Sequence, residues 1–286
     1  TFLKQDKARM KNNLRGIRYI VIDESSMISH EMLKFIKEDA ALNNRQYLFI
    51  GDHCQIPPVN EPHSPIFDLT DTAPLTEIIR QGEGSPIITL ATQIRRMIEG
   101  ERNVQLSMAA ESSVGNIKAM DTEQFLEAIY DNDFMADGNN DRIIAWTNAS
   151  VKQYNSMVCD SYGIKDDFVP GLHIVFNEAL IQQDEIVANN GCEGEVTTVE
   201  YKVSKAGLPY YQIGVSELEG TFKVIPNNYH DQYQNYFQSL KAIALKTPSK
   251  WIDFYRSKEE YADIRPRFAS SAHKSQGSTY ENIYID

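Results

Sequence analysis

The chain has 286 residues, of which 42% are hydrophobic and 24% charged, so it has room for two domains and the composition of an ordinary globular protein. It contains neither an apolar run of the ~20 residues that a membrane helix needs nor a signal-peptide hydrophobic region near Thr1, and we predict a cytoplasmic location without a membrane partner. Three widely spaced cysteines exclude a zinc knuckle and a disulfide framework: Cys54, Cys159 and Cys192.

The net charge of −12 counts against a purely electrostatic nucleic-acid binder, because such proteins are normally basic. The charge is uneven, however. Six of the first 18 residues are basic and one is acidic. A basic channel inside an acidic shell and an ordinary solvated helix face are both compatible with this pattern.

The first elements predict a β-α-β unit. Residues 17–22 and 47–50 are continuous apolar runs, which is typical of buried parallel strands. The segment between them has apolar residues at helical spacing, and Ser29 can cap the start of that helix. An α/β sheet is therefore expected, with Asp23-Glu24 and the segment 51–55 at the carboxyl ends of two strands, where such sheets bind ligands.

Helices are predicted next over residues 85–99 and 122–130. A further strand over 142–146 ends in Thr147-Asn148 and is followed by a helix over 149–158. This repeats the strand, polar turn and helix of the first part, and so it indicates a second α/β domain.

The pattern changes after Gly171. Residues 172–225 form short alternating runs separated by glycines, which predicts a small antiparallel barrel or sheet. Residues 229–262 are helical and aromatic, and the α/β pattern returns over 270–285. The β segment is therefore expected to be inserted in the second α/β domain.

The acidic pair and the second strand end suit nucleotide chemistry. Asp23 could hold Mg²⁺, and Glu24 could orient and deprotonate a water that attacks a γ-phosphate. Acidic residues that complement a helix N-terminus are the alternative interpretation. In the segment 51–59, Gly51 permits a tight turn, Gln55 offers a donor and an acceptor to a terminal phosphate, and the two prolines that follow stiffen the connection.

Several of these segments resemble the conserved motifs of a known protein family. Residues 23–27 and 51–59 resemble motifs II and III of the superfamily 1B DNA helicases, and residues 75–80 are similar to motif IV. Residues 145–150 and 272–277 resemble later motifs, in the order of the family. The RecD-like and Dda-like group is the most similar, and Trp251 and Tyr255 resemble the aromatic pair of its accessory domain.

The resemblance implies two RecA-like domains of the P-loop NTPase type, the first one partial, with an inserted SH3-like β domain. The implied boundaries are 1–82 for the first RecA-like domain, 83–171 and 263–286 for the second, and 172–262 for the inserted domain with its helical extension. The implied activity is 5′→3′ translocation on single-stranded DNA and duplex unwinding, driven by hydrolysis of ATP with Mg²⁺.

The resemblance also implies roles for individual residues. Asp23 would hold Mg²⁺, Glu24 would be the catalytic base, and Gln55 and Arg80 would reach the γ-phosphate. Four residues would bind the DNA backbone: Thr147, Asn148, His273 and Lys274. Two residues would join the nucleotide site and couple it to DNA: Gln276 and Gly277. Trp251 and Tyr255 would stack bases or pack the accessory domain, and plain core packing is an equal alternative. Arg95 and Arg96 are expected to be helix-surface residues without a role.

Two departures matter. No glycine is followed by lysine, so the phosphate-binding loop G-x-x-x-x-G-K-[ST] is absent, and the chain ends before the family's arginine-bearing last motif. We therefore expect a central fragment of an ATP-dependent DNA helicase, monomeric and inactive by itself, with single-stranded DNA and single-strand-binding or replication proteins as partners. A non-catalytic nucleic-acid-binding module derived from a helicase and an RNA helicase are the alternatives.

Overall fold

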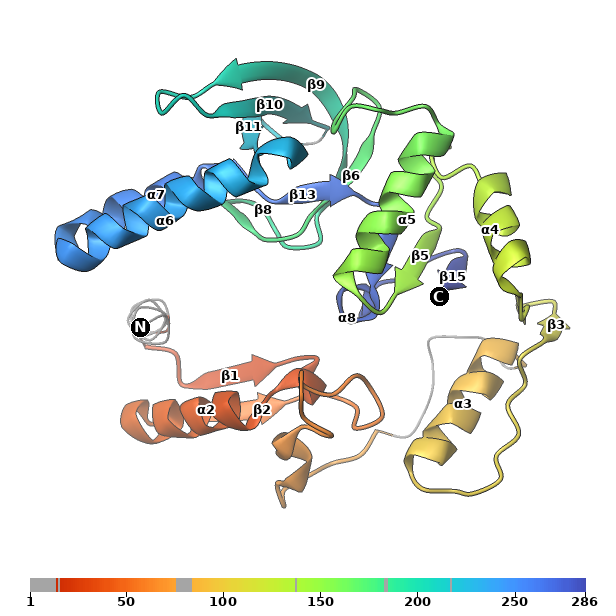
Figure 1. Cartoon of the computed structure of the whole chain (residues 1–286). Helices are drawn as coiled ribbons and strands as arrows, with labels where there is room; N and C mark the ends of the chain where they lie inside the picture. The colour runs from red at the N-terminus through yellow and green to blue at the C-terminus, as the bar shows by residue number, and fades with distance from the viewer. Residues whose placement is uncertain (1–13, 15, 76–83, 137, 183–184, 217) are drawn as a thin grey trace. The chain divides into compact units, whose positions relative to one another are not determined.

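The computed structural model describes the chain except residues 1–13, 15, 76–83, 137, 183–184 and 217 (Figure 1). The chain divides into two compact units, Thr1–Met120 and Asp121–Asp286. The expected domain boundaries at 82/83, 171/172 and 262/263 stay predictions. Among the described residues, no helix is long and apolar enough to cross a membrane.

The first unit contains the predicted β-α-β element. Strands β1 (Tyr19–Ile22) and β2 (Gln46–Phe49) are parallel, and helix α2 (His30–Asn43) connects them. The Ser29 hydroxyl caps α2 by accepting a hydrogen bond from the Met32 amide, as predicted. The helix packs its apolar side on one face of the strands. The buried residues of this small core are Ile28, Leu33, Ile36 and Ile66.

The expected burial of β1 and β2 on both faces is wrong for the described residues. Along each strand, half-buried and exposed residues alternate, and the Tyr19 and Val21 side chains are 65% and 60% exposed. The half-buried residues Ile22, Tyr47 and Phe49 pack on the core below α2. One face of the sheet is therefore covered and the other is open.

The remaining elements of the first unit are short apart from one helix. They are η1 (Ser25–Met27), η2 (Pro65–Asp68), α3 (Pro86–Ile98), β3 (Ala110–Ser112) and β4 (Gly115–Ile117). Helix α3 matches the prediction over 85–99. It contacts the antiparallel β3–β4 hairpin, which is the last element before the division between the units.

The second unit contains a three-stranded parallel sheet of order β14-β5-β15. Its elements are α4 (Thr122–Asp131), β5 (Arg142–Ala145), α5 (Asn148–Ser161), β14 (Ala269–Ser271), α8 (Ala272–Ser275) and β15 (Ile283–Ile285). The central strand β5, predicted over 142–146, is buried along its whole length from Arg142 to Ala145. Helix α5 packs beside it (Figure 1).

A larger, mainly antiparallel sheet occupies the rest of the second unit, as expected from the alternating pattern. Its order is β12-β11-β10-β9-β6-β13, and only the β11–β12 pair is parallel. The strands are β6 (His173–Phe176), β9 (Glu193–Val203), β10 (Pro209–Val215), β11 (Thr221–Val224), β12 (Tyr261–Ala262) and β13 (Ile264–Pro266), beside a separate hairpin of β7 (Leu180–Gln182) and β8 (Glu185–Ala188). The two sheets share one hydrophobic core, which runs from Ile143 through Phe176 to Val224.

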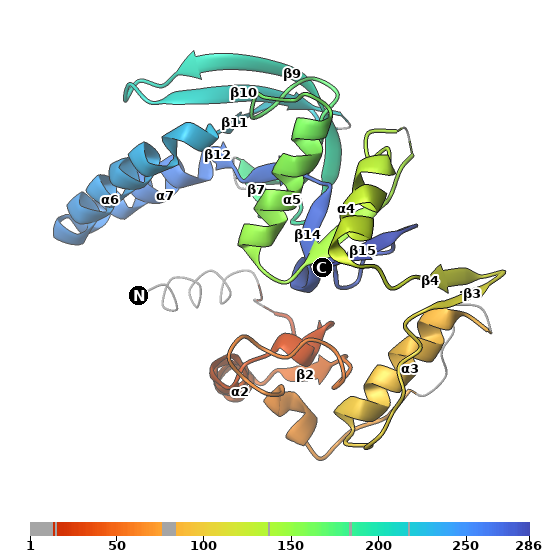
Figure 2. The same ribbon diagram turned by 45° about the vertical axis from the view of Figure 1, so that its right-hand side comes forward.

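Two helices extend from this sheet side by side (Figure 2). They are α6 (His230–Lys246), which follows η3 (Asn227–Tyr229), and α7 (Trp251–Glu259), which follows η4 (Pro248–Lys250). Tyr233 anchors α6, because its side chain is 1% exposed and its hydroxyl donates to the Pro209 carbonyl over 2.9 Å. Burial raises the pKa of Tyr233, and its ring lies 5.0 Å from that of Tyr261 on β12.

Candidate nucleotide and nucleic-acid sites

The chain makes a sharp change of direction directly after β1. Asp23 and Glu24 are both exposed, and Glu24 adopts the left-handed conformation with φ 50° and ψ 40°. Its amide donates to the Asp23 carboxylate over 2.9 Å. A non-glycine residue in this region costs about 1–2 kcal/mol, so the surrounding contacts must hold it there. The helix that follows is a single 3-10 turn at Ser25–Met27, which is too short for the alternative role of the acids at a helix N-terminus.

The contacts that hold this turn come from the end of β2. The Ser25 amide and hydroxyl both donate to the Ile50 carbonyl, over 2.9 and 2.8 Å. A Cβ atom on Gly51 would lie 2.8 Å from the Ser25 hydroxyl oxygen and 3.1 Å from the Ser26 amide nitrogen. Gly51 is therefore required for close approach of the two loops, rather than for the tight turn that the sequence suggested.

The loop that carries Gln55 has its own internal bonds. The Asp52 carboxylate accepts from the Cys54 amide, and the Asp52 carbonyl accepts from the Gln55 amide, each over 3.0 Å. Gln55 is exposed, and Pro58 is buried three residues later. The predicted phosphate ligand Arg80 lies outside the described residues.

Asp52 also binds an arginine for which the sequence predicts no role. The two terminal nitrogens of the Arg95 guanidinium on α3 donate to the two Asp52 carboxylate oxygens, one of them over 3.1 Å. Partial burial raises the pKa of Asp52, but the hydrogen bonds from Arg95 and the Cys54 amide outweigh it and hold this pKa below its ordinary value. Arg95 lies on the helix surface, as expected, with its side chain 42% exposed, but it has a partner in Asp52. Arg96 pairs with Glu101 at the exposed surface.

The donors at the strand ends fit a magnesium ion. Mg²⁺ prefers oxygen ligands and is usually held by one or two carboxylates plus phosphate oxygens. Among the residues that the structure describes, neither the Asp23 nor the Glu24 carboxylate forms an ion pair, and both are exposed. Asp52, by contrast, is already neutralised by Arg95. Within the described part of the chain, Asp23 and Glu24 are therefore the two carboxylates without an ion pair at these strand ends, and the role of Asp23 as a Mg²⁺ ligand stays a prediction.

In the second unit, two strand ends bring the other predicted motifs together. Strands β5 and β14 are parallel with Ala145 opposite Ser271, so the residues that follow each strand are neighbours. Thr147 is the N-cap of α5 and accepts from the Ser150 amide over 3.0 Å. Thr147 and Asn148 are exposed. This end of the sheet thus presents polar groups from both motifs.

Trp146 belongs to this site, although the residue-by-residue prediction omitted it. Its side chain is 67% exposed, directly after a strand that is buried throughout. Its ring lies 5.4 Å from the His273 ring on α8. The one signal in the sequence was a large aromatic residue at the end of the strand, next to the polar pair Thr147-Asn148.

Lys274 does not present a free ammonium group. Its Nζ donates to the backbone carbonyl and the side-chain oxygen of Asn177, over 2.8 and 3.1 Å. Burial and the neighbouring charge of Arg265 lower the pKa of Lys274. The lysine therefore ties α8 to the end of β6 in the larger sheet. Gln276 follows α8, and Gly277 turns the chain in the left-handed region with φ 80°.

Trp251 and Tyr255 lie on one face of α7 with Phe254 beside them. The rings of Trp251 and Tyr255 are stacked at 5.7 Å, and Phe254 meets both edge-on at 5.5 and 5.1 Å. All three are half-buried. The three rings pack on one another within α7 and each stays partly exposed, so base stacking and packing of the accessory domain both stay predictions.

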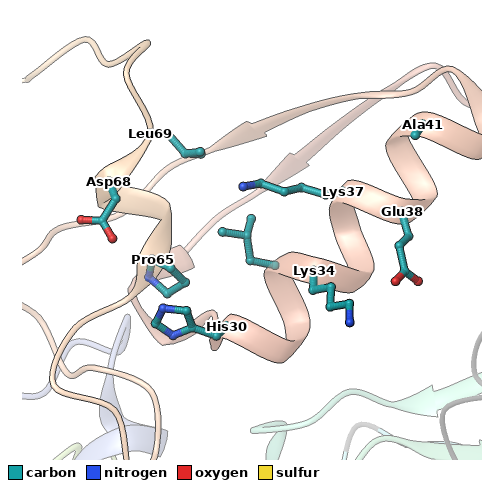
Figure 3. A pocket seen from close by; sticks show the side chains of 9 residues that line it. His30, Lys34, Lys37, Glu38, Ala41, Pro65, Asp68 and Leu69 are labelled. Carbon is teal, nitrogen blue, oxygen red and sulfur yellow. The ribbon is translucent and has the colours of Figure 1, made fainter.

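A separate pocket in the first unit involves none of the predicted site residues. It lies between α2 and η2, with Lys34 and Lys37 projecting from the helix and Pro65 and Asp68 on the other side (Figure 3). His30 at its edge is held by Glu61, whose carboxylate lies 2.8 Å from the imidazole Nδ1.

Comparison with known proteins connects these sites to one family. A family model described as an AAA domain matches residues 1–122. The ATP-dependent DNA helicase dda of Enterobacteria phage T4 is 26% identical over 96% of this chain and 69% of its own length. The uncharacterized protein R530 of Acanthamoeba polyphaga mimivirus is 23% identical over 93% of this chain and 68% of its own length.

The solved structures agree at the level of the fold. The crystal structure of Pif1 helicase from Candida albicans aligns with 99% of this chain and 68% of that chain, with a TM-score of 0.50 and 13% identity. The α/β fold of this chain is therefore RecA-like. Together with the motifs in their family order, these similarities support a relationship to the superfamily 1B helicases of the Dda- and Pif1-like kind.

Proposed function

We propose that this chain provides the hydrolysis and DNA-tracking parts of an ATP-dependent motor that moves 5′→3′ on single-stranded DNA and unwinds duplexes. The observation that carries the proposal is the joining of the two strand ends. The Ser25 bonds to Ile50 hold the acidic pair Asp23-Glu24 against the loop that leads to Gln55. Acidic and amide groups at adjacent parallel strand ends suit a nucleotide and its cation.

The groups at these strand ends have different proposed roles in ATP hydrolysis. An Asp23 oxygen would hold Mg²⁺, directly or through water, and a bound ion would supply positive charge for the phosphates. Glu24 accepts a proton from the attacking water, because its carboxylate is exposed and has no ion pair among the described residues. Gln55 bonds the terminal phosphate with its amide group, and Arg80 is proposed as a second phosphate ligand.

The DNA strand would bind at the ends of β5 and β14. His273, Thr147 and Asn148 offer polar groups for the phosphates, while Trp146 offers an exposed ring for a base. Gln276 and Gly277 follow directly and are proposed to connect this site with the nucleotide. We propose an SH3-like character for the larger sheet, with Trp251 and Tyr255 stabilising its helical extension.

The test is hydrolysis of ATP by the full-length protein with and without single-stranded DNA. Glu24→Gln should lower the rate of DNA-stimulated ATP hydrolysis by about 10²–10⁴-fold and leave the Kd for single-stranded DNA unchanged. Glu31→Gln is the matched control, because Glu31 is an exposed glutamate in the first turn of α2 and should keep wild-type turnover. Equal loss of turnover and DNA binding in Glu24→Gln would show that Glu24 is structural.

Direction is tested with duplexes that carry a single-stranded tail at one end. The proposal expects unwinding from a 5′ tail and none from a 3′ tail, and the opposite preference would overturn the stated polarity. An RNA tail tests the nucleic-acid class, because the 2′-hydroxyl is the group that separates RNA from DNA.

A non-catalytic nucleic-acid-binding module derived from a helicase is the second candidate. None of the 15 glycines in this chain is followed by lysine. We therefore propose that the 286-residue chain alone does not hydrolyse ATP. Turnover by this chain that Glu24→Gln removes would overturn that part. DNA binding by a full-length protein that never turns over ATP would favour the binding module.

A further inference from the structure

We infer that Arg95 is a positioning residue, which holds the Gln55 loop in place from α3 and so sets the rate of the hydrolytic step. The inference rests on the proposed ATP hydrolysis. It concerns a residue that binds no phosphate itself and acts through Asp52.

The first ground is the geometry of the ion pair. A guanidinium that bonds both oxygens of one carboxylate fixes the orientation as well as the position of its partner. Asp52 is held in this way by Arg95 and in turn accepts from the Cys54 amide, while its carbonyl accepts from the Gln55 amide. Consecutive hydrogen bonds therefore connect Arg95 on α3, through Asp52, with the backbone amide of Gln55.

A second contact joins the same two segments. The His53 Nε2 atom lies 3.5 Å from the Glu99 carboxylate, at the residue that caps the C-terminal end of α3. The loop is thus held by the Arg95–Asp52 ion pair and approaches α3 again at the next residue, His53. The last turn of a helix is a rigid support for a loop, and rigid support is what a site needs to hold a group within hydrogen-bonding reach of a phosphate.

Arg95 also determines which carboxylate near the strand ends can bind a cation, Asp23 or Asp52. Because its guanidinium neutralises Asp52, this carboxylate neither competes with Asp23 for a cation nor repels the phosphates near Gln55. Loss of the arginine would release a partly buried negative charge beside the loop. The expected effect is therefore on the orientation of Gln55 and on the charge next to the phosphate, and not on the binding of ATP as a whole.

The direct test measures the loop itself and needs no turnover. In Arg95→Ala, hydrogen exchange of the Cys54 and Gln55 amides should accelerate by about tenfold, since local opening loses a charge-assisted bond. Arg96→Ala is the matched control, because Arg96 is the next residue and pairs with Glu101 at the surface. Wild-type exchange rates in Arg95→Ala would overturn the inference.

The kinetic test separates positioning from binding. In the full-length protein, Arg95→Ala should lower kcat by about tenfold with a KM for ATP within about twofold of wild type. Arg95→Lys should have a kcat between those of Arg95→Ala and wild type, because an ammonium keeps the positive charge but cannot form the bidentate pair with Asp52. Asp52→Asn, which keeps the shape of the loop residue, should lose rate like Arg95→Ala, and the double variant should lose little more.

The proposed ATP hydrolysis and the positioning role of Arg95 are tested by different results. A wild-type protein without ATP hydrolysis would overturn the proposed function, and the exchange rates would still decide whether Arg95 holds the loop. A wild-type kcat in Arg95→Ala, in a protein that hydrolyses ATP, would overturn the inference alone. A large rise in KM with unchanged kcat would also overturn it, because that pattern belongs to ground-state binding.

Discussion

Trp146, directly after strand β5, and His273, in helix α8, face each other with ring centroids 5.4 Å apart and planes inclined by 48°. The indole is 67% exposed although the strand before it is entirely buried. The parallel pairing of Ala145 with Ser271 creates this contact, since it places the two strand ends side by side. An exposed aromatic ring next to polar groups is a surface on which a nucleobase can stack.

We therefore expect Trp146→Ala to weaken binding of oligothymidylate by roughly 1–3 kcal/mol, the usual value of one stacked base. The chain has two tryptophans, which provides an internal control. Quenching of tryptophan fluorescence by the oligonucleotide should disappear in Trp146→Phe and persist in Trp251→Phe. Persistent quenching in Trp146→Phe would place the DNA elsewhere.

Lys274 should behave as a structural tie in the free protein. Its ammonium binds two oxygens of Asn177, so Lys274→Ala should lower the free energy of unfolding by about 1 kcal/mol after allowance for partial exposure. Lys152→Ala is the control, because Lys152 is exposed on α5 and makes no contact that the structure records among its described residues. Denaturant unfolding measures both.

The salt dependence of DNA binding gives Lys274 a second readout. If the lysine stays on Asn177 in the complex, the slope of log K against log salt should be the same in Lys274→Ala as in wild type. A slope smaller by about one would show that Lys274 leaves Asn177 for a phosphate, as the family resemblance implies.

Gly51→Ala should destabilise the first unit by roughly 1–3 kcal/mol, because the new methyl group would overlap Ser25. Ser25 is fully buried and its hydroxyl is bonded to Ile50, so it cannot move aside without losing that bond. In the double variant with Ser25→Ala, the hydroxyl overlap disappears and the backbone overlap remains.

Part of the stability should therefore return in the double variant. Thermal unfolding of the three proteins decides the matter. A wild-type midpoint in Gly51→Ala would show that the two loops can separate at little cost.

Alkaline pH should destabilise the first unit through Tyr47. Burial, followed by the 2.6 Å hydrogen bond to Asp39, raises the pKa of Tyr47 from 10.0 to about 12. A raised pKa means that the unfolded chain loses this proton first. The contribution of Tyr47 to stability is therefore complete below pH 10.0 and is lost as the pH rises through about 12.

Urea unfolding at a series of pH values between about 9 and 12 tests this, with Tyr47→Phe as the comparison. The midpoint of the wild-type protein should fall more steeply over this range than that of Tyr47→Phe. Parallel curves would show that Tyr47 ionises in the folded protein as it does in the unfolded one.

The sequence by itself determined the elements and the motifs that end them. Continuous apolar runs predicted β1, β2 and β5, the hydroxyl of Ser29 predicted the start of α2, and alternating runs predicted the larger sheet. Local spacing controls these features, because each strand or helix must place its apolar residues on one side. The acidic pair after β1 could be found in the same way, since a strand end fixes its neighbours along the chain.

Only the tertiary structure decided which side chains meet. Arg95 and Arg96 are alike in sequence, but the helix turns one toward Asp52, 43 residues earlier, and the other toward solvent. Lys274 meets Asn177 across 97 residues, and Trp146 is exposed because its strand ends at Ala145. Contacts across such separations depend on how whole elements pack, and no local pattern records that packing.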